Sequence, residues 1–476
     1  MKQTIKCLIA AFAAMLMSVA AFAQVTTSAL GGRVVDANGE PIIGAAVVAT
    51  HEPSGTVYGV ITNNDGRYAI NGMRSGGPYK VEFSCLGYQS LAYTDVTLQL
   101  AETTALNAQL NEDSEMLGEA MVIAAAASKF AAEKTGAATN ISGSQITSLP
   151  TVSRSITDVT RLSPYGGNGM SFAGSDGRTA NFTVDGANFN NNFGLNDGLP
   201  GGGSPISIDA IEEMQVVISP YDVRQTNFIG GGVNAITKSG TNKFRGTAYV
   251  YHQNQDLHGD TIDGTQIDGA RAKDMNTTYG FTLGGPIIKN KLFFFVNAEL
   301  TKKPSVVNRW RGTSVIDENG NGVGDAGNYI SRTTLYDLER VSKFVKEKYG
   351  YDTGSWTAFP ADESNRKILA RIDWNINDNH KLALRYNHTL NRRWSSPNGT
   401  SMDGGSRLAS YRMSKNSMSY ANSMYSQDNL VNSISLDLNS RFSDNLSNQL
   451  LVTYSQLNDV RGSTSDLFPF IDIKKD

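Results

Sequence analysis

The chain has 476 residues, enough for more than one domain, with 47 glycines and only 18% charged residues. Its 42 basic and 45 acidic residues leave a formal charge of −3, and this slight acidic excess argues against a nucleic-acid-binding surface. The mean hydropathy is −0.29, and beyond residue 23 no apolar run reaches the roughly 18 residues that a membrane helix needs.

Residues 1–23 have the three parts of a secretory signal peptide: a start with two lysines, an apolar stretch, and the cleavage motif Ala-Phe-Ala at 21–23. We expect the mature chain to begin at Gln24. Cys7 lies within the apolar stretch rather than at the cleavage point, so its lipidation is not expected. Cys85 is then the one cysteine of the mature chain, and no intrachain disulfide can form.

Residues 24–111 contain short β-rich segments separated by turn pairs, among them Asn38-Gly39 and Asp65-Gly66. This pattern predicts a small antiparallel β-sandwich. The region resembles the carboxypeptidase-regulatory-like domain found at the front of many outer-membrane receptors, through the stretches GRVVDANGEPIIGAAV, TNNDGRYAI and YKVEFSCLGYQS. Cys85 falls within the last predicted strand, where we interpret it as a small buried hydrophobic residue.

The chain lacks the motifs of hydrolytic and nucleotide-binding enzymes. None of its five histidines begins the HxxE or HExxH pattern that holds zinc. It also lacks the GxSxG nucleophile elbow and the GxxxxGK phosphate loop. Glu212 and Glu213 are a carboxylate pair, but adjacent side chains rarely converge, so we interpret them as part of a solvated face. We therefore expect no enzyme and no required cofactor.

Residues 112–128 form a linker that changes from acidic to apolar and then to alanine-rich. The apolar tetrapeptide Met121, Val122, Ile123 and Ala124 could donate a strand to the sheet edge of a partner, because backbone hydrogen bonds supply affinity with little demand on side chains. The stretch LGEAMVIA looks like the TonB box of TonB-dependent receptors. The start of a helix is the alternative interpretation.

Residues 129–240 resemble the plug domain of the same receptors, through ISGSQITSLPTVSRSITDVTRLSP, ANFTVDGANFNN and IDAIEEMQVVISPYDVRQTNFIGGGVNAITKSGTNKFRG. We expect a short helix at 153–162, a strand that ends in the turn at 184–186, and a passage from helix to strand at 208–218. The Gly- and Asn-rich stretch 188–203 is interpreted as plug loops, and the substrate-binding residues remain unknown.

Residues 241–476 have the pattern of a transmembrane β-barrel. Seven segments between 245 and 457 alternate apolar and polar residues, as at 367–376, and this period of two predicts strands with one face toward lipid and the other toward water. Long connections at 253–277, 302–364 and 391–429 alternate with short turns, as in outer-membrane barrels with short periplasmic turns and long extracellular loops. A soluble β-sandwich is the alternative for this region alone.

The order of sandwich, TonB box, plug and barrel is that of a TonB-dependent outer-membrane receptor, and the passage IGGGVNAITKSGTNKFRG looks most like the Oar-like branch. We therefore expect a mainly β protein: an N-terminal β-sandwich, an α+β plug and the first strands of a transmembrane antiparallel barrel. Plugged transporters have about 22 strands, so seven strands predict the N-terminal portion of a longer chain.

The resemblance implies transport of an unidentified ligand across the outer membrane, energised when the C-terminal domain of TonB pairs with the box. Its partners would be TonB, outer-membrane lipid and the ligand. A SusD-like lipoprotein is compatible with the resemblance but unsupported by any residue. The alternatives are a surface adhesin or structural envelope protein without transport, and an inactive receptor fragment.

The long connection 302–364 contains the sequence Asp317-Glu318-Asn319-Gly320-Asn321-Gly322-Val323-Gly324-Asp325, which matches the start of a calcium-binding loop. The predicted calcium ligands are Asp317, Asn319, Asn321, the carbonyl of Val323 and Asp325. Asn328 replaces the usual bidentate Glu, so we expect weak affinity, in the range of about 0.1 to 1 mM. The alternative is an Asn-Gly turn without a metal.

Overall fold

The structure is a computed structural model that describes residues 25–112, 121–124, 137–149, 151, 154–190, 199, 204–219, 225, 229–259, 261–266, 275–304, 309–360, 362–396, 413–469, 471 and 473. The predicted signal peptide lies outside the described residues, as do the linker residues on either side of 121–124 and most of the predicted plug loop 188–203.

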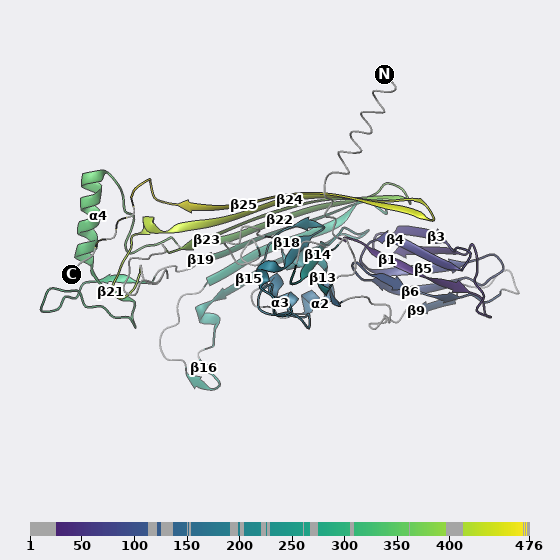
Figure 1. Ribbon diagram of the computed structural model, residues 1–476, viewed down its shortest axis with the longest axis horizontal. Coiled ribbons are helices and arrows are strands. Elements are labelled where there is room, and N and C mark those ends of the chain that lie inside the picture. The colour runs from purple at the N-terminus through teal and green to yellow at the C-terminus, as the bar shows by residue number, and fades with distance from the viewer. Residues whose placement is uncertain are drawn as a thin grey trace, which may run out of the picture.

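The N-terminal region is a β-sandwich of two sheets (Figure 1). One sheet has the order β4-β1-β7, with β8 also paired to β1, and the other has the order β3-β2-β5-β6-β9. The strands are β1 (Ser28–Val35), β2 (Ala46–His51), β3 (Thr56–Ile61), β4 (Arg67–Met73), β5 (Gly76–Ser84), β6 (Leu91–Leu98), β7 (Thr103–Ala105), β8 (Ala108–Gln109) and β9 (Met121–Ala124). Alternate residues point inward along each strand. Val81 and Phe83 of β5 therefore meet Leu30 and Val34 of β1 in one buried core.

The sandwich confirms the expected turns but corrects two other expectations. Gly39 and Gly66 have φ angles of 87° and 71°, the left-handed conformation that such tight turns require. The pairing is not purely antiparallel, because the chain crosses to the other sheet after β6 and then runs beside β1 in the same direction. Cys85 does not lie in the last strand: it follows β5, precedes four more strands of the sandwich, and is half-buried.

The region predicted to be the plug, called the plug below, contains a mixed sheet of order β10-β13-β14-β11-β12, in which β11 and β14 are parallel. Its elements are β10 (Ala137–Ser142), α2 (Gly143–Ser148), α3 (Ile156–Thr160), η1 (Gly177–Thr179), β11 (Asn181–Val184), β12 (Ala187–Asn188), η2 (Ile208–Ala210), β13 (Ile211–Ser219) and β14 (Gly232–Thr237). The expected helix at 153–162 forms in a shorter version as α3. It begins after Ser155, which forms a capping box with Asp158. The expected passage from helix to strand is η2 followed by β13.

Seven long antiparallel strands form one sheet in sequence order, as the alternation predicted. They are β15 (Arg245–Asn254), β18 (Met275–Ile288), β19 (Leu292–Pro304), β22 (Asp362–Asn375), β23 (His380–Ser395), β24 (Tyr425–Ser443) and β25 (Leu446–Ser463). Figure 1 shows the plug lying against this sheet and the sandwich at one end of it. Helix α4 (Leu335–Tyr349) and strand β21 (Ile330–Thr334), from the longest connection, lie at the opposite end.

The sheet inverts the usual burial pattern of a soluble protein. On β22, Ile368, Ile372 and Trp374 are 41 to 43% exposed, whereas Lys367 and Asp373 are 6% and 2% exposed. The polar face is covered by the plug, and the apolar face has the character of a surface that contacts lipid. Among the described residues, no helix is long and apolar enough to cross a membrane.

The sandwich lies beside the short turns of the sheet. Asn242, just before β15, donates its N–H to the carbonyl of Pro53 at 2.8 Å. The side chain of Asn375, at the end of β22, donates to the hydroxyl of Thr56 at 2.9 Å. Short turns are periplasmic in outer-membrane barrels, so in a barrel of that kind this arrangement corresponds to a sandwich on the periplasmic side.

Candidate functional site

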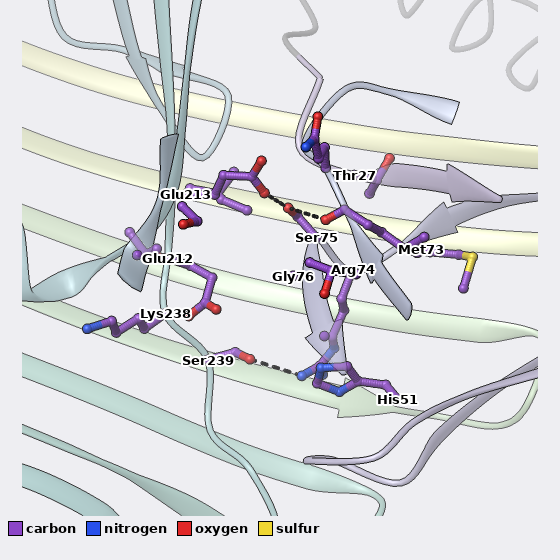
Figure 2. A pocket seen from close by; sticks show the side chains of 18 of the residues that line it. Thr27, His51, Met73, Arg74, Ser75, Gly76, Glu212, Glu213, Lys238 and Ser239 are labelled. Atoms are coloured by element: carbon purple, nitrogen blue, oxygen red, sulfur yellow. Dashed lines mark hydrogen bonds between the residues drawn. The ribbon is translucent and has the colours of Figure 1, made fainter. Parts of the chain in front are cut away.

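A cavity of about 1470 Å³ lies where the sandwich, the plug and the sheet meet. Figure 2 shows its central residues: Arg74 and Ser75 from the loop between β4 and β5, Glu212 and Glu213 from β13, and Ser239 after β14. The five come from sandwich and plug segments far apart in the sequence.

Glu213 is one of the residues through which the plug holds the sandwich. The Ser75 hydroxyl donates to one oxygen of the Glu213 carboxylate (Figure 2), and the N–H of Leu100 donates to the other at 3.0 Å. Gln215, two residues along β13, donates its amide to the Leu100 carbonyl at 2.9 Å. Glu213 is only 5% exposed. The expectation of a solvated face at Glu212 and Glu213 is therefore wrong for Glu213, because a second domain covers this strand.

Arg74 joins the sandwich to both other parts. Its guanidinium donates to the Ser239 hydroxyl at 3.0 Å and lies 3.8 Å from the Asp373 carboxylate on β22 (Figure 2 shows the first contact). His51 of β2 lies nearby and is buried. Burial and the positive charge of Arg74 together lower the pKa of His51 to about 3, although Asp373 opposes the shift. Because of this low pKa, His51 is neutral at physiological pH. Burial also raises the pKa of Glu212, although the positive charges of Lys238 and nearby arginines oppose this shift.

The plug is attached to the sheet by a buried cluster of opposite charges. Arg385 of β23 lies between Asp185 of the plug and Asp437 of β24, at 3.4 and 3.6 Å, and all three side chains are at most 4% exposed. Arg371 of β22 makes an ion pair of 2.8 Å with Asp373 on the same strand and also donates to the carbonyl of Thr237 in the plug. Thr237 in turn donates its hydroxyl to Asp185 at 2.8 Å.

A second cluster surrounds Glu299 of β19. The ammonium of Lys367 lies 2.7 Å from one Glu299 oxygen, and the hydroxyls of Tyr249 and Ser207 donate to the other at 2.8 and 2.9 Å. Ser207 belongs to the plug and precedes η2. Arg154 of the plug lies 3.7 Å from the same carboxylate. Each cluster thus combines charged groups of the sheet with groups of the plug.

Buried ion pairs of this kind add little net stability, but removal of one partner leaves an uncompensated buried charge. The plug can therefore move away from the sheet only if several charges are exposed to water together. Lys367, Arg371 and Arg385 lie on the polar face of the sheet and are buried there. Nothing in the sequence indicated that Asp185 and Thr237 of the plug would meet them, because the resemblance to a plug assigns no contact to these two residues.

The predicted TonB box forms strand β9, which pairs in parallel with β6 of the sandwich. Its four residues are therefore extended, and the alternative of a helix start is wrong for these residues. The box lies on the same domain that contacts Glu213 of the plug.

The predicted calcium loop forms tight turns at the end of the molecule far from the sandwich. One Asp317 oxygen accepts the N–H groups of Asn319 and Asn321 at 2.9 and 2.8 Å. Asp325 accepts the side-chain amide of Asn328 at 2.8 Å, and Val323 bonds to Val315 through its N–H. In the described part of the chain, no three or more His, Cys, Asp or Glu side chains form a group that could hold a metal. The predicted site contains only two such side chains, so calcium binding stays a prediction.

Comparison with known proteins decides the family. Residues 29–111 match the carboxypeptidase regulatory-like domain, and residues 236–473, half of the chain, match the outer membrane beta barrel domain. Over 394 residues the chain is 27% identical to TonB-dependent transporter Oar of Myxococcus xanthus, and this alignment covers 79% of the chain. The chain belongs to the family of TonB-dependent outer-membrane receptors. The resemblance found in the sequence is thereby confirmed for the family and for its place in the outer membrane.

The receptor is also 36% identical over 118 residues, 25% of its length, to TonB-dependent receptor SusC of Bacteroides thetaiotaomicron. It spans 34% of the length of Oar and 10% of the length of SusC. Both relatives are named as a transporter or a receptor, not as an enzyme.

Solved structures that resemble the receptor include the siderophore receptor PirA from Pseudomonas aeruginosa, with a TM-score of 0.41 and 12% identity. That alignment covers 69% of the receptor and 42% of PirA. The outer membrane transporter YddB from Escherichia coli has a TM-score of 0.43 and 12% identity, with 68% and 39% of the two chains covered.

Proposed function

We propose that the receptor moves a ligand across the outer membrane with energy supplied through TonB. The observation that carries the proposal is the plug held against the sheet by two buried charge clusters around Arg385 and Glu299. Passage of a ligand requires the plug to shift, and a shift that exposes these charges requires work. The name of the relative Oar, a TonB-dependent transporter, points to the same source of energy.

The contact with TonB would be made by Met121, Val122, Ile123 and Ala124, through strand addition to the C-terminal domain of TonB. This tetrapeptide lies between the sandwich and the plug in the sequence, so a pull on it acts on both. It is also short and extended, as strand addition requires.

Replacing Val122 with proline tests the contact, because proline removes a backbone N–H that a strand pair uses. We expect the C-terminal domain of TonB to bind the V122P receptor at least about tenfold more weakly in a pull-down titration. The matched control is V122T, which keeps a β-branched side chain and the backbone donor. Equal TonB binding by V122P and V122T would show that the tetrapeptide is not the TonB box.

A second candidate is a surface adhesin or structural envelope protein. It is favoured by α4, which carries Tyr336, Phe344 and Tyr349 with 54 to 69% of each side chain exposed, at the end opposite the sandwich. Deleting residues 121–124 discriminates between the two functions, because transport needs the box whereas adhesion does not. A SusD-like surface lipoprotein would also contact this end, and co-purification from solubilised outer membranes would identify such a partner.

A further inference from the structure

Strand β9 is the last strand of the sheet β3-β2-β5-β6-β9. It pairs with β6 in a continuous register, from Leu91 opposite Met121 to Thr94 opposite Ala124. Strand β6 is itself anchored in the sandwich core, because Leu91 and Val96 are at most 5% exposed. The box therefore rests on a rigid edge of a folded domain.

The available edge of β6 is four residues long for a structural reason. Asp95 has a φ angle of 59°, a left-handed conformation that a regular strand does not allow. The register between β5 and β6 shifts at the same place, between the pairs Val81 with Tyr93 and Tyr79 with Val96. This bulge ends regular pairing on the outer edge after Thr94. The edge and the tetrapeptide 121–124 thus have the same length.

The chain also passes close to the start of β6 at an earlier point. Glu112 forms an antiparallel bridge with Tyr88, three residues before Leu91. Only residues 113–120 separate this bridge from Met121, which lies opposite Leu91. A connection this short keeps the box at an effective concentration on the order of millimolar beside β6. Docking of the four residues is therefore a property of one chain and needs no partner.

A strand has two hydrogen-bonding edges, and β6 uses only one edge of β9. In the described part of the chain, no strand pairs with the other edge. Such an open edge accepts an added strand. Its backbone is already extended, so a partner strand pairs with it without the entropy cost of ordering it.

We propose that the sandwich is the platform that presents the box, and that TonB adds its strand to the outer edge of β9 while β9 stays paired with β6. The TonB-binding surface is then the edge of a continuous sheet that includes the sandwich. The same domain bonds to Glu213 of the plug through Ser75 and Leu100. A pull by TonB reaches the plug through these contacts as well as through the chain after residue 124. This inference rests on the proposed contact between TonB and the tetrapeptide.

A reversible lock between β6 and β9 tests the proposal. Thr94 and Ala124 are register partners, so T94C with A124C, in a C85S background, places two cysteines on neighbouring strands at a spacing that suits a disulfide. The C-terminal domain of TonB is titrated onto the full receptor in detergent, with the same variant in its oxidised and reduced forms. We expect the two dissociation constants to agree within about threefold. Loss of binding by more than about tenfold on oxidation, restored by reduction, would mean that β9 must leave β6, and would overturn the proposal.

A second variant measures the contribution of the platform. Deletion of residues 25–111 leaves the tetrapeptide without β6, and we expect TonB to bind this receptor about tenfold more weakly or worse, because the strand must then be ordered on binding. Unchanged affinity would also overturn the platform. V122P separates this inference from the proposed function. If V122P binds TonB as well as the wild type does, the box itself is misassigned. If V122P loses binding while the locked form also loses it, only the platform is wrong.

Discussion

At the scale of single residues, buried and exposed ion pairs of this receptor differ in what the loss of one partner costs. Arg385 is 4% exposed and lies between Asp185 and Asp437, whereas Arg392 on the same strand is 45% exposed and pairs with Asp428 at 2.6 Å. The pair of Arg392 with Asp428 is shorter but contributes less to the stability of the fold, because water screens exposed charges and competes for them. Loss of Arg385 is more destabilising, because no solvent replaces the lost partner of a buried carboxylate.

We expect R385M to destabilise the receptor by about 3 to 5 kcal/mol, because the substitution leaves two buried carboxylates without their shared cation. R392M on the same strand is the control and should cost less than about 1 kcal/mol. Urea unfolding of the detergent-solubilised receptor measures both. Similar midpoints for the two variants would argue against a role of Arg385 in holding the plug.

His51 should make the stability of the receptor depend on pH. Its pKa is lowered to about 3 in the folded protein from an ordinary value of 6.5, so the unfolded state binds the proton more readily. The stabilisation is fully present above pH 6.5 and is lost as the pH falls from 6.5 toward 3, by about 1.4 kcal/mol per unit. The H51Q variant has no titrating side chain at position 51. The difference in melting temperature between wild type and H51Q should therefore shift between pH 7.5 and pH 5, and a constant difference would contradict this assignment.

At the scale of elements, turn chemistry and metal binding compete for the same side chains in the loop 317–325. Asp317 accepts two backbone N–H groups and Asp325 accepts an amide. Hydrogen bonds from Asn328 and Gly327 also lower the pKa of Asp325. These bonds stabilise charged carboxylates, which calcium also requires, and each carboxylate has further lone pairs for a ligand.

We expect calcium to bind this loop with a dissociation constant of about 0.1 to 1 mM, and D317A to abolish binding. E318A is the matched control, because Glu318 is adjacent in the sequence but absent from the predicted ligand set. Isothermal titration of calcium into the full receptor distinguishes the variants. Binding that is the same in D317A and E318A would place any calcium elsewhere.

At the scale of the whole molecule, the seven-stranded sheet ends at β15 and β25, and in the described part of the chain each of these two strands has one open edge. Unpaired backbone groups in hydrocarbon cost several kcal/mol each, and closed barrels avoid this cost. The exposed apolar residues of β22 and its neighbours face outward in the same way as in a closed barrel. The sheet therefore depends on pairing partners at both edges.

Residues 1–476 expressed alone should consequently be exported but fail to form a heat-resistant barrel. The measurement is a gel shift between heated and unheated samples in cold detergent. A clear heat-dependent shift would show that the open edges find partners, for example in another copy of the chain.

The sequence alone determined the period of the strands, the order of long and short connections, the turns at glycines and the family, because these depend on local residue patterns. The number of barrel strands and the polarity of their two faces followed from the same alternation.

Only the tertiary structure decided which distant groups meet. Glu213 was taken for a solvated residue because nothing near it in the sequence announces Ser75 and Leu100. Asp185 and Arg385 are 200 positions apart, and no local pattern links them. The docking of residues 121–124 on β6 depends on a bulge at Asp95, which no residue pattern predicted. Local patterns specify which edges and charges exist, whereas the packing of domains specifies which of them become partners.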